Sequence, residues 1–335
     1  MKNIIPKKKE LNPYYIVTTE YTHQSAGVKV LHLLCHHLNK QGYPAFIYDY
    51  FAHKKRKSYI NTNYITPVIS KEIIKYHKST NKNPIAIYPE VMRGNPINSN
   101  CVVRYLLNYP GLLGGVIEDE FDKDDIIFSY SQKIKNSLKN NNSEVLFMPV
   151  CDTNIFYEDK NSKIKRIGSC FYASKYQNHH NGELFEVTNN SIEITRGLPD
   201  SQTPKQIADL FRKSEIFYSY EDTSLATEAL LCGCPVMFIK NKFFKQNALA
   251  SCELGNEGCV YNFNKEDIVN ATKNIPIAQK KYFKAVDNYW SMLDNFIKIT
   301  QEKSFSRSAG NNIKFAKKRI PFGRLIKSYL GSVQK

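Results

Sequence analysis

The stretch FYSYEDTSLATEALLCGCPVMFI, residues 217–239, decides the fold. Its two ends are rich in aromatic and β-branched residues, as buried strands are. Between them, a turn of acids and hydroxyls precedes an apolar helical segment that carries Glu228 and ends at Gly233 and Pro235. The order strand, helix, strand predicts a βαβ unit, and such units build parallel sheets.

The polar residues of this stretch stand where α/β proteins bind ligands. In open α/β sheets, ligands bind beyond the carboxyl ends of the strands, where the free amides of helix N-termini attract anions. Thr223 and Ser224 stand at the expected helix start, so they are expected to cap the helix and to bond a phosphate oxygen. Glu228 follows one turn later and is expected to accept the hydroxyls of a ribose. The alternatives are plain capping and a surface carboxylate.

The run from Tyr220 to Pro235 resembles the donor-site signature of GT-B fold glycosyltransferases, in which two Glu residues precede a small-Gly-x-Pro-Val turn. Glu228 and CGCPV match its second half. The first Glu falls on Tyr220, with Glu221 one residue later, which is closer to the variant found in bacterial polysaccharide glycosyltransferases. The resemblance implies that a short set of residues contacts a nucleotide-sugar donor: Tyr220, Glu221, Asp222, Thr223, Ser224 and Glu228.

Weaker resemblances extend along the chain. Residues 23–43 resemble the first loop and helix of the acceptor-side domain, where Gly27 matches a glycine of the loop. Residues 170–176, CFYASKY, resemble the first strand of the donor domain, where a lysine meets the donor diphosphate. The matching lysine is Lys175, with Arg196 beside it. These cations and a helix N-terminus would replace a metal, so the resemblance implies neither a metal nor a cofactor.

The first half of the chain alternates strands and helices. Strands are predicted at 14–21, 44–50, 83–91, 125–131 and 144–150, a helix at 28–43, and a short helix at 100–111 that ends at Pro110 and Gly111. This pattern predicts a Rossmann-like domain. A polar stretch at 157–165 marks a boundary, after which the alternation resumes with a strand at 166–176, a helix at 203–215 capped by Thr203 and a strand at 216–220.

Four parts are predicted along the chain: an acceptor domain at 1–152, a donor domain at 153–276, a long helix at 277–303 that crosses back, and a basic amphipathic tail at 304–335. The expected fold is GT-B, with two Rossmann-like domains that face a central cleft.

Two residues of the first domain are candidates for acid–base chemistry. Glu90 closes a buried strand and is therefore expected at a carboxyl end, as a base or an anchor for the acceptor hydroxyl. Its alternative is local pairing with Arg93. His23 lies in the first loop that would face the cleft, as acid, base or sugar contact, or as plain polar surface. An inverting reaction would need such a base, and a retaining reaction would not.

Metal ligation is not expected. His32 and His36 have the i, i+4 spacing of helical metal ligands, but no third ligand has a matching spacing nearby. Asp122 and Asp124 resemble the manganese pattern of glycosyltransferases of another fold, without the apolar strand that surrounds it there. A solvated acidic loop is expected instead.

Composition and charge indicate a globular protein with a basic end. The 335 residues are 42% hydrophobic, which is enough for two domains with cores. The net charge is +16, and residues 301–335 carry nine Lys and Arg against Glu302. Mixed with Phe, Leu and Ile, these cations are typical of an anchor for anionic lipid, and a solvated extension is the alternative. No nucleic-acid motif is present, so nucleic acid is not expected as a partner.

The sequence predicts a cytoplasmic location, at most on a membrane surface. The N-terminus lacks a signal peptide, no apolar run has membrane-spanning length, and the eight cysteines show no disulfide or zinc pattern.

The predicted function is a metal-independent glycosyltransferase of bacterial cell-surface polysaccharide synthesis, such as capsule, O-antigen or lipopolysaccharide. It would transfer a sugar from a nucleotide sugar to a glycan or lipid-linked acceptor. Two alternatives stay open, a nucleotide-sugar epimerase of the same fold and a non-catalytic scaffold that binds glycan or nucleotide.

Overall fold

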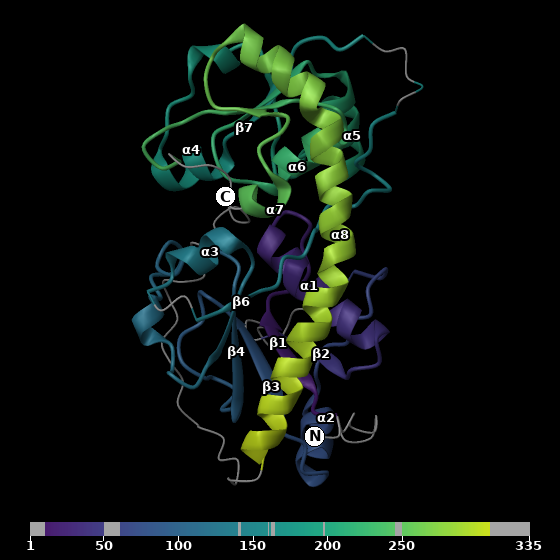
Figure 1. Cartoon of the computed structure of the whole chain (residues 1–335), viewed down its shortest axis with the longest axis vertical. Coiled ribbons are helices and arrows are strands. Elements are labelled where there is room, and N and C mark those ends of the chain that lie inside the picture. Colours follow the sequence, from purple (N-terminus) through teal and green to yellow (C-terminus); the bar gives the residue numbers. More distant parts are fainter. Residues whose placement is uncertain are drawn as a thin grey trace. The chain divides into compact units, whose positions relative to one another are not determined.

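The computed structural model describes residues 11–49, 61–139, 142–159, 161, 165–196, 198–244 and 250–308 (Figure 1). These residues form two compact units. Unit 1 holds the described residues up to Met148 and those from Tyr289 on, and unit 2 is Pro149–Asn288. Each unit contains one sheet in which all paired strands run parallel. The predicted α/β class with two Rossmann-like domains is confirmed.

The sheet of unit 1 has six strands in the order β2-β1-β3-β4-β5-β6. Helices α1, α2 and α3 connect its strands, with a short 3-10 turn between β4 and β5. The elements are β1 (Tyr14–Thr18), α1 (Ala26–Lys40), β2 (Ala45–Asp49), α2 (Lys71–Ser79), β3 (Ile85–Pro89), β4 (Cys101–Leu106), η2 (Glu118–Glu120), β5 (Ile126–Ser129), α3 (Gln132–Ser137) and β6 (Glu144–Val145).

The strand order of unit 1 fixes where a ligand can bind. The chain passes from β1 to β2 on one side and returns to place β3 on the other side of β1. At such a switch point, the connections leave the carboxyl ends of β1 and β3 in opposite directions and open a crevice. The residues that follow Thr18 and Pro89 therefore occupy the binding edge of this sheet.

The prediction of a helix at 100–111 is wrong, because residues 101–106 form the central strand β4. Val102 and Val103 are β-branched and buried between β3 and β5. Arg104 is also buried: its Nε donates to Asp125 at 2.6 Å and its Nη1 to the carbonyl of Met92 at 2.8 Å. Distant partners therefore allow a cation inside the sheet.

The sheet of unit 2 has five strands in the order β11-β10-β9-β7-β8, so its switch point lies between β7 and β9. The predicted strand at 166–176 is shorter than expected, because α4 begins two residues after β7 ends. The elements are β7 (Ser169–Tyr172), α4 (Ser174–His180), η3 (Glu186–Thr188), β8 (Ile192–Glu193), α5 (Pro204–Lys213), β9 (Ile216–Ser219), α6 (Ser224–Leu231), β10 (Val236–Phe238), α7 (Ser251–Leu254) and β11 (Cys259–Val260).

The last described element, α8 (Lys265–Ser308), supplies residues to both units. It begins earlier than the predicted 277, since Pro276 lies inside the helix rather than before it. In unit 2, the hydroxyl of Tyr282 accepts from the amide of Cys151 at 3.0 Å. In unit 1, Gln301 accepts from the amide of Asn12 at 3.1 Å. The helix is therefore an integral part of both units.

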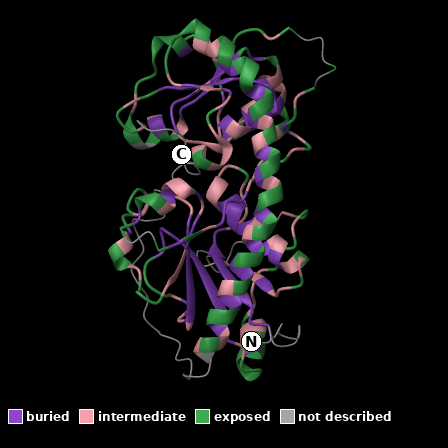
Figure 2. Ribbon diagram, viewed as in Figure 1, coloured by how far each residue is buried: buried purple, intermediate pink, exposed green. Residues whose placement is uncertain are grey.

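Burial follows the sheets, as Figure 2 shows: β1, β3 and β4 consist of buried residues only. Among the described helices, none is long and apolar enough to span a bilayer. Of the predicted basic tail, only 304–308 are described, and they continue α8; residues 309–335 lie outside the described part of the chain.

Candidate functional site

The predicted donor residues of unit 2 gather at the carboxyl ends of β7 and β9. Glu221 follows β9, Lys175 is the second residue of α4, and Ser224 begins α6. Arg196 follows β8 and reaches the same edge, because its side chain lies 3.6 Å from Glu228 of α6. The switch point of this sheet therefore collects the carboxylates of Glu221, Asp222 and Glu228, the cations Lys175 and Arg196, and the hydroxyls of Thr223 and Ser224.

The hydroxyls of Thr223 and Ser224, at the start of α6, have different roles. Thr223 is the N-cap, as predicted, and its hydroxyl accepts from the amide of Leu225 at 3.3 Å. The hydroxyl oxygen of Ser224 is buried and has no hydrogen-bond partner among the described residues. A buried hydroxyl without a partner is costly, which makes Ser224 Oγ a candidate contact for a ligand at the helix N-terminus.

Glu228 and Arg196 form a buried ion pair. Glu228 is 2% exposed, and the Arg196 side chain is 9% exposed. The separation of 3.6 Å between Arg196 Nη2 and Glu228 Oε2 is longer than the roughly 2.7–2.9 Å of a charge-assisted hydrogen bond. A buried charge without a partner is strongly destabilising, so each of these two side chains stabilises the other. The pair therefore fixes the position of Glu228 at the edge of the sheet.

Tyr172, the last residue of β7, belongs to the same cluster and is absent from the predictions. The guanidinium of Arg196 lies 5.5 Å from the centre of its ring. Burial raises the pKa of Tyr172, and the charges of Glu221 and Glu228 raise it further, while Arg196 lowers it. A tyrosine at the end of a buried strand has no distinctive sequence pattern, so only the fold identifies it.

The carboxylate of Glu221 is hydrogen-bonded to backbone amides at the start of α4. Its Oε2 accepts from the amide of Lys175 at 2.6 Å and from the amide of Tyr176 at 3.0 Å. Its Oε1 is buried and has no hydrogen-bond partner among the described residues. Burial raises the pKa of this carboxyl, against the lowering effect of Lys175 and of the two amides. Glu221 therefore holds the start of α4 through Oε2, and its Oε1 is a candidate ligand contact.

Tyr220 does not lie at the ligand-binding surface, which corrects its predicted role. It is 1% exposed and packs against Tyr176, with ring centroids 5.1 Å apart. Its hydroxyl accepts from the amide of Phe185 at 2.8 Å and bonds Thr188 Oγ1 at 2.8 Å. The side chain is therefore part of the core.

The two remaining predicted donor residues lie at the carboxyl ends of β7 and β9. Asp222 is half-buried there, and Lys175 is exposed.

The turn after α6 requires Gly233. Its φ is +77°, and a Cβ there would lie 2.6 Å from Arg166 Nη2 and 2.7 Å from Glu158 Oε1. Arg166 in turn donates to the carbonyl of Cys232 at 2.8 Å. This explains the CGCP turn on packing grounds, independently of any ligand.

Glu90 lies at the switch point of unit 1, directly after β3. It is 2% exposed, and its Oε2 accepts from the amide of Leu107 at 2.9 Å. Burial raises the pKa of Glu90 to about 7, although hydrogen bonds from Leu107 and Asn108 lower it. The pKa suits a general base, but the contacts make Glu90 a clamp on the loop after β4. No contact with Arg93 is observed among the described residues, since Arg93 pairs with Glu120 at 3.0 Å.

His23 and Gly27 also belong to unit 1. His23 is exposed in the loop that follows β1, at the binding edge of the sheet. Gly27 was expected in that loop but is the second residue of α1, so it belongs to a helix. Ser25 caps this helix by accepting from the amide of Val28.

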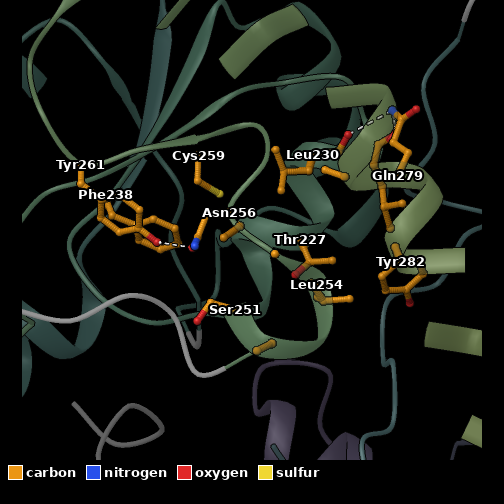
Figure 3. A pocket seen from close by; sticks show the side chains of 15 residues that line it. Thr227, Leu230, Phe238, Ser251, Leu254, Asn256, Cys259, Tyr261, Gln279 and Tyr282 are labelled. Carbon is orange, nitrogen blue, oxygen red and sulfur yellow. Dashed lines mark hydrogen bonds between the residues drawn. The ribbon is translucent and has the colours of Figure 1, made fainter. Parts of the chain in front are cut away.

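A mainly apolar pocket of unit 2 lies on another face of α6 (Figure 3). Its empty volume is about 500 Å³, part of it open to solvent. Thr227, Leu254 and Tyr282 line it, and none of the predicted site residues does. Tyr261 donates to Asn256 at its rim, and Gln279 donates to the carbonyl of Leu230.

No metal centre is found among the described residues, because nowhere in that part of the chain do three or more His, Cys, Asp or Glu side chains gather as ligands. Both helical histidines have other partners: His32 Nε2 bonds the carbonyl of Thr19 at 3.0 Å, and His36 Nδ1 accepts from the amide of Ile65 at 2.9 Å. Asp122 accepts from the amide of Asp124 within its own turn.

No protein-family profile matches the sequence, and no curated protein matches it. Solved structures with similar architecture include an alpha-glucosyltransferase in complex with UDP and a 13-mer DNA, at 14% identity over 89% of this chain and 99% of that chain, with a TM-score of 0.38. The glycosyltransferase SnogD from Streptomyces nogalater is 9% identical over 85% and 99%, with a TM-score of 0.43. A putative UDP-N-acetylglucosamine 2-epimerase from Listeria monocytogenes is 11% identical over 82% and 90%, with a TM-score of 0.36.

Proposed function

We propose that the chain is a glycosyltransferase that uses a nucleotide sugar as donor. The observation that carries the proposal is the cluster at the switch point of unit 2, where Ser224, Glu221 and the Arg196–Glu228 pair meet. Hydroxyls, carboxylates and cations at one sheet edge suit a ligand that has both phosphates and sugar hydroxyls.

Each residue of the cluster has a distinct part in the proposed chemistry. Ser224 Oγ at the start of α6 would bind the diphosphate, with Lys175 as the exposed cation of the same edge. Charge that develops on the departing diphosphate would be stabilised by these groups. Glu228, held by Arg196, would accept the ribose hydroxyls, and Glu221 Oε1 would accept a further hydroxyl of the donor.

For the acceptor hydroxyl, we assign the base to His23 if the reaction inverts. His23 is exposed at the binding edge of unit 1, whereas Glu90 is enclosed by backbone amides. Glu90 then acts as a positioning residue that holds the loop after β4. A retaining reaction would need neither residue as a dedicated base.

The acceptor that we propose is a glycan or lipid-linked glycan of bacterial cell-surface polysaccharide synthesis. This finer assignment is supported by the resemblance of residues 220–235 to polysaccharide glycosyltransferases. The basic and apolar residues of the C-terminal tail support attachment to an anionic membrane surface from the cytoplasm. The same resemblance implies no metal or other cofactor.

The test is calorimetric titration of the full chain with UDP, GDP, CMP and dTDP. One of these nucleotides is expected to bind, and Glu228→Gln is expected to weaken it about tenfold, because one charged hydrogen bond is lost. Glu257→Gln is the matched control, since it removes a carboxylate that pairs with Lys281 elsewhere in unit 2.

Failure of all four nucleotides to bind would sink the proposal and favour the scaffold. If a nucleotide binds and the chain interconverts a nucleotide sugar without any acceptor, the epimerase takes its place. Equal weakening by Glu257→Gln would show that the loss reflects unit 2 as a whole and not Glu228.

A further inference from the structure

Five partly exposed aromatic rings of unit 1 form a continuous series that the proposed chemistry does not use. They come from four parts of the chain: Tyr21 follows β1, His36 and His37 lie on α1, Tyr64 lies in the segment after β2, and Trp290 lies on α8. We call this set, Tyr21, Tyr64, His36, His37 and Trp290, the aromatic strip.

Consecutive rings of the aromatic strip are in contact. The ring centroids are 5.6 Å apart from Tyr21 to Tyr64, 5.4 Å from Tyr64 to His36, 5.4 Å from His36 to His37 and 5.0 Å from His37 to Trp290. Neighbouring rings are edge-on or tilted to one another, with interplanar angles of 86°, 32°, 50° and 51° in the same order, so they form one connected cluster.

Hydrogen bonds fix the two histidines in place. His37 Nδ1 bonds the hydroxyl of the buried Tyr289 at 2.9 Å, and His36 Nδ1 accepts from the amide of Ile65 at 2.9 Å. The surface is therefore preorganised, which lowers the entropic cost of binding.

The aromatic strip has no charge of its own at neutral pH. Burial lowers the pKa of His37 to about 4, and burial together with Lys40 lowers the pKa of His36. Both imidazoles are neutral, so an anionic ligand gains no charge pairing from the rings. A neutral ligand with flat apolar faces and a rim of hydrogen-bonding groups fits better, because aromatic side chains offer large, rigid contact areas.

Two observations indicate that this surface is a binding face and not only packing. Trp290 is 41% exposed and Ile65, next to Tyr64, is 52% exposed, so apolar surface remains open along the strip. The strip also begins at Tyr21, two residues before His23, and thus at the binding edge of the sheet in unit 1.

We propose that the aromatic strip binds an extended neutral oligosaccharide by stacking of successive sugar rings. The choice of ligand rests on the proposed glycosyltransferase function, in which this oligosaccharide is the non-reacting part of the acceptor glycan. The acceptor is then a chain of several neutral sugars, and not a monosaccharide or a small aglycone.

Trp290 is the single tryptophan of the chain, so its fluorescence reports on the strip alone. The probes are maltohexaose, cellohexaose and chitohexaose, with glucose and N-acetylglucosamine as monomers and single-stranded oligo-dT as a nucleic acid. At least one hexaose is expected to change the emission saturably, about tenfold more tightly than its monomer.

Variants separate the strip from general surface effects. Tyr64→Ala is expected to weaken the hexaose about tenfold by calorimetry. Tyr76→Ala removes a more exposed aromatic ring, 63% exposed on α2 and outside the strip, and is expected to leave the affinity unchanged. Trp290→Phe should remove the optical signal and retain calorimetric binding.

No saturable response to any hexaose, equal loss in Tyr76→Ala, or tighter binding of oligo-dT would overturn the proposal. Because no nucleotide is present, this result is independent of the donor-site test. Nucleotide binding without oligosaccharide binding rejects the strip alone. Oligosaccharide binding without nucleotide binding rejects the glycosyltransferase and retains the strip as a glycan site.

Discussion

The guanidinium of Arg196 lies 3.6 Å from the carboxylate of Glu228, and both side chains are almost fully buried. Arg196 lies between β8 and α5, whereas Glu228 lies on α6, so the pair exists only in the folded protein. It places one carboxylate of the candidate site in a fixed position and makes that position dependent on Arg196.

Loss of either partner should therefore be costly. Glu228→Ala or Arg196→Ala is expected to lower the free energy of unfolding by about 3 kcal/mol, because a buried charge loses its partner. The double variant should lose less than the sum of the two. Urea unfolding of all four proteins measures this, with Glu257→Ala, from a more exposed pair, expected to cost about 1 kcal/mol or less. Additive losses would contradict the coupling.

Removal of the hydroxyl of Thr223 and removal of the hydroxyl of Ser224 should affect the stability of the protein differently. Thr223→Ala removes the cap of α6 and is expected to destabilise the protein by about 1 kcal/mol. Ser224→Ala removes a buried hydroxyl that lacks a hydrogen-bond partner among the described residues, so stability should stay level or rise. It should weaken the bound nucleotide about tenfold. Thermal unfolding and nucleotide titration of both variants decide the matter, and a destabilised Ser224→Ala would argue against a free hydroxyl.

Glu90 should make stability depend on pH. Its pKa is raised from 4.5 to about 7 in the folded protein, so the folded state holds a proton that the unfolded chain has released. Stability is therefore full below about pH 4.5 and falls as the pH rises through about 7, by an amount on the order of 3 kcal/mol. Denaturant unfolding from about pH 5 to about pH 8 should show a smaller fall in Glu90→Gln. Glu144→Gln, which replaces an exposed carboxyl, is the control and should show the same pH dependence as the unaltered protein. If Glu90→Gln also showed that pH dependence of the free energy of unfolding, the assignment would be refuted.

The turn at Gly233 should not tolerate a side chain. Gly233→Ala combines a positive φ with an added Cβ less than 3 Å from the ends of the Arg166 and Glu158 side chains, which would have to move, so a loss of about 2 kcal/mol is expected. Gly168→Ala is the matched control in unit 2, because its φ is +70° but nothing lies within 4 Å of the added Cβ. The control should cost about 1 kcal/mol from backbone strain alone. Equal melting temperatures for the two variants would show that the turn can adjust.

Tyr220 should matter for stability and not for ligand binding. Tyr220→Phe leaves the amide of Phe185 without its acceptor and should cost about 1–2 kcal/mol. Tyr218→Phe is the control, since its hydroxyl makes no hydrogen bond to the described residues. Nucleotide affinity, measured by titration, should match that of the unaltered protein, and a large loss would return Tyr220 to the donor site.

Local sequence was sufficient for the features that depend on neighbours along the chain. The βαβ order of residues 217–239, the cap at Thr223, the capped helix that starts at Pro204 and the long C-terminal helix were all predictable. Hydrophobic period, capping residues and turn residues act over a few positions, so they can be read without the fold.

Tertiary structure decided the features whose partners are distant. Residues 101–106 form a strand because they pair with β3 and β5, and because the buried Arg104 donates a hydrogen bond to the carboxylate of Asp125. The same cause determined that Glu221 caps α4 while Tyr220 enters the core. Burial and pairing of a side chain depend on segments far away in sequence, and its local pattern does not encode them. The sequence by itself therefore determined the class of fold and the position of the candidate site, and the packing within unit 2 decided which residues reach it.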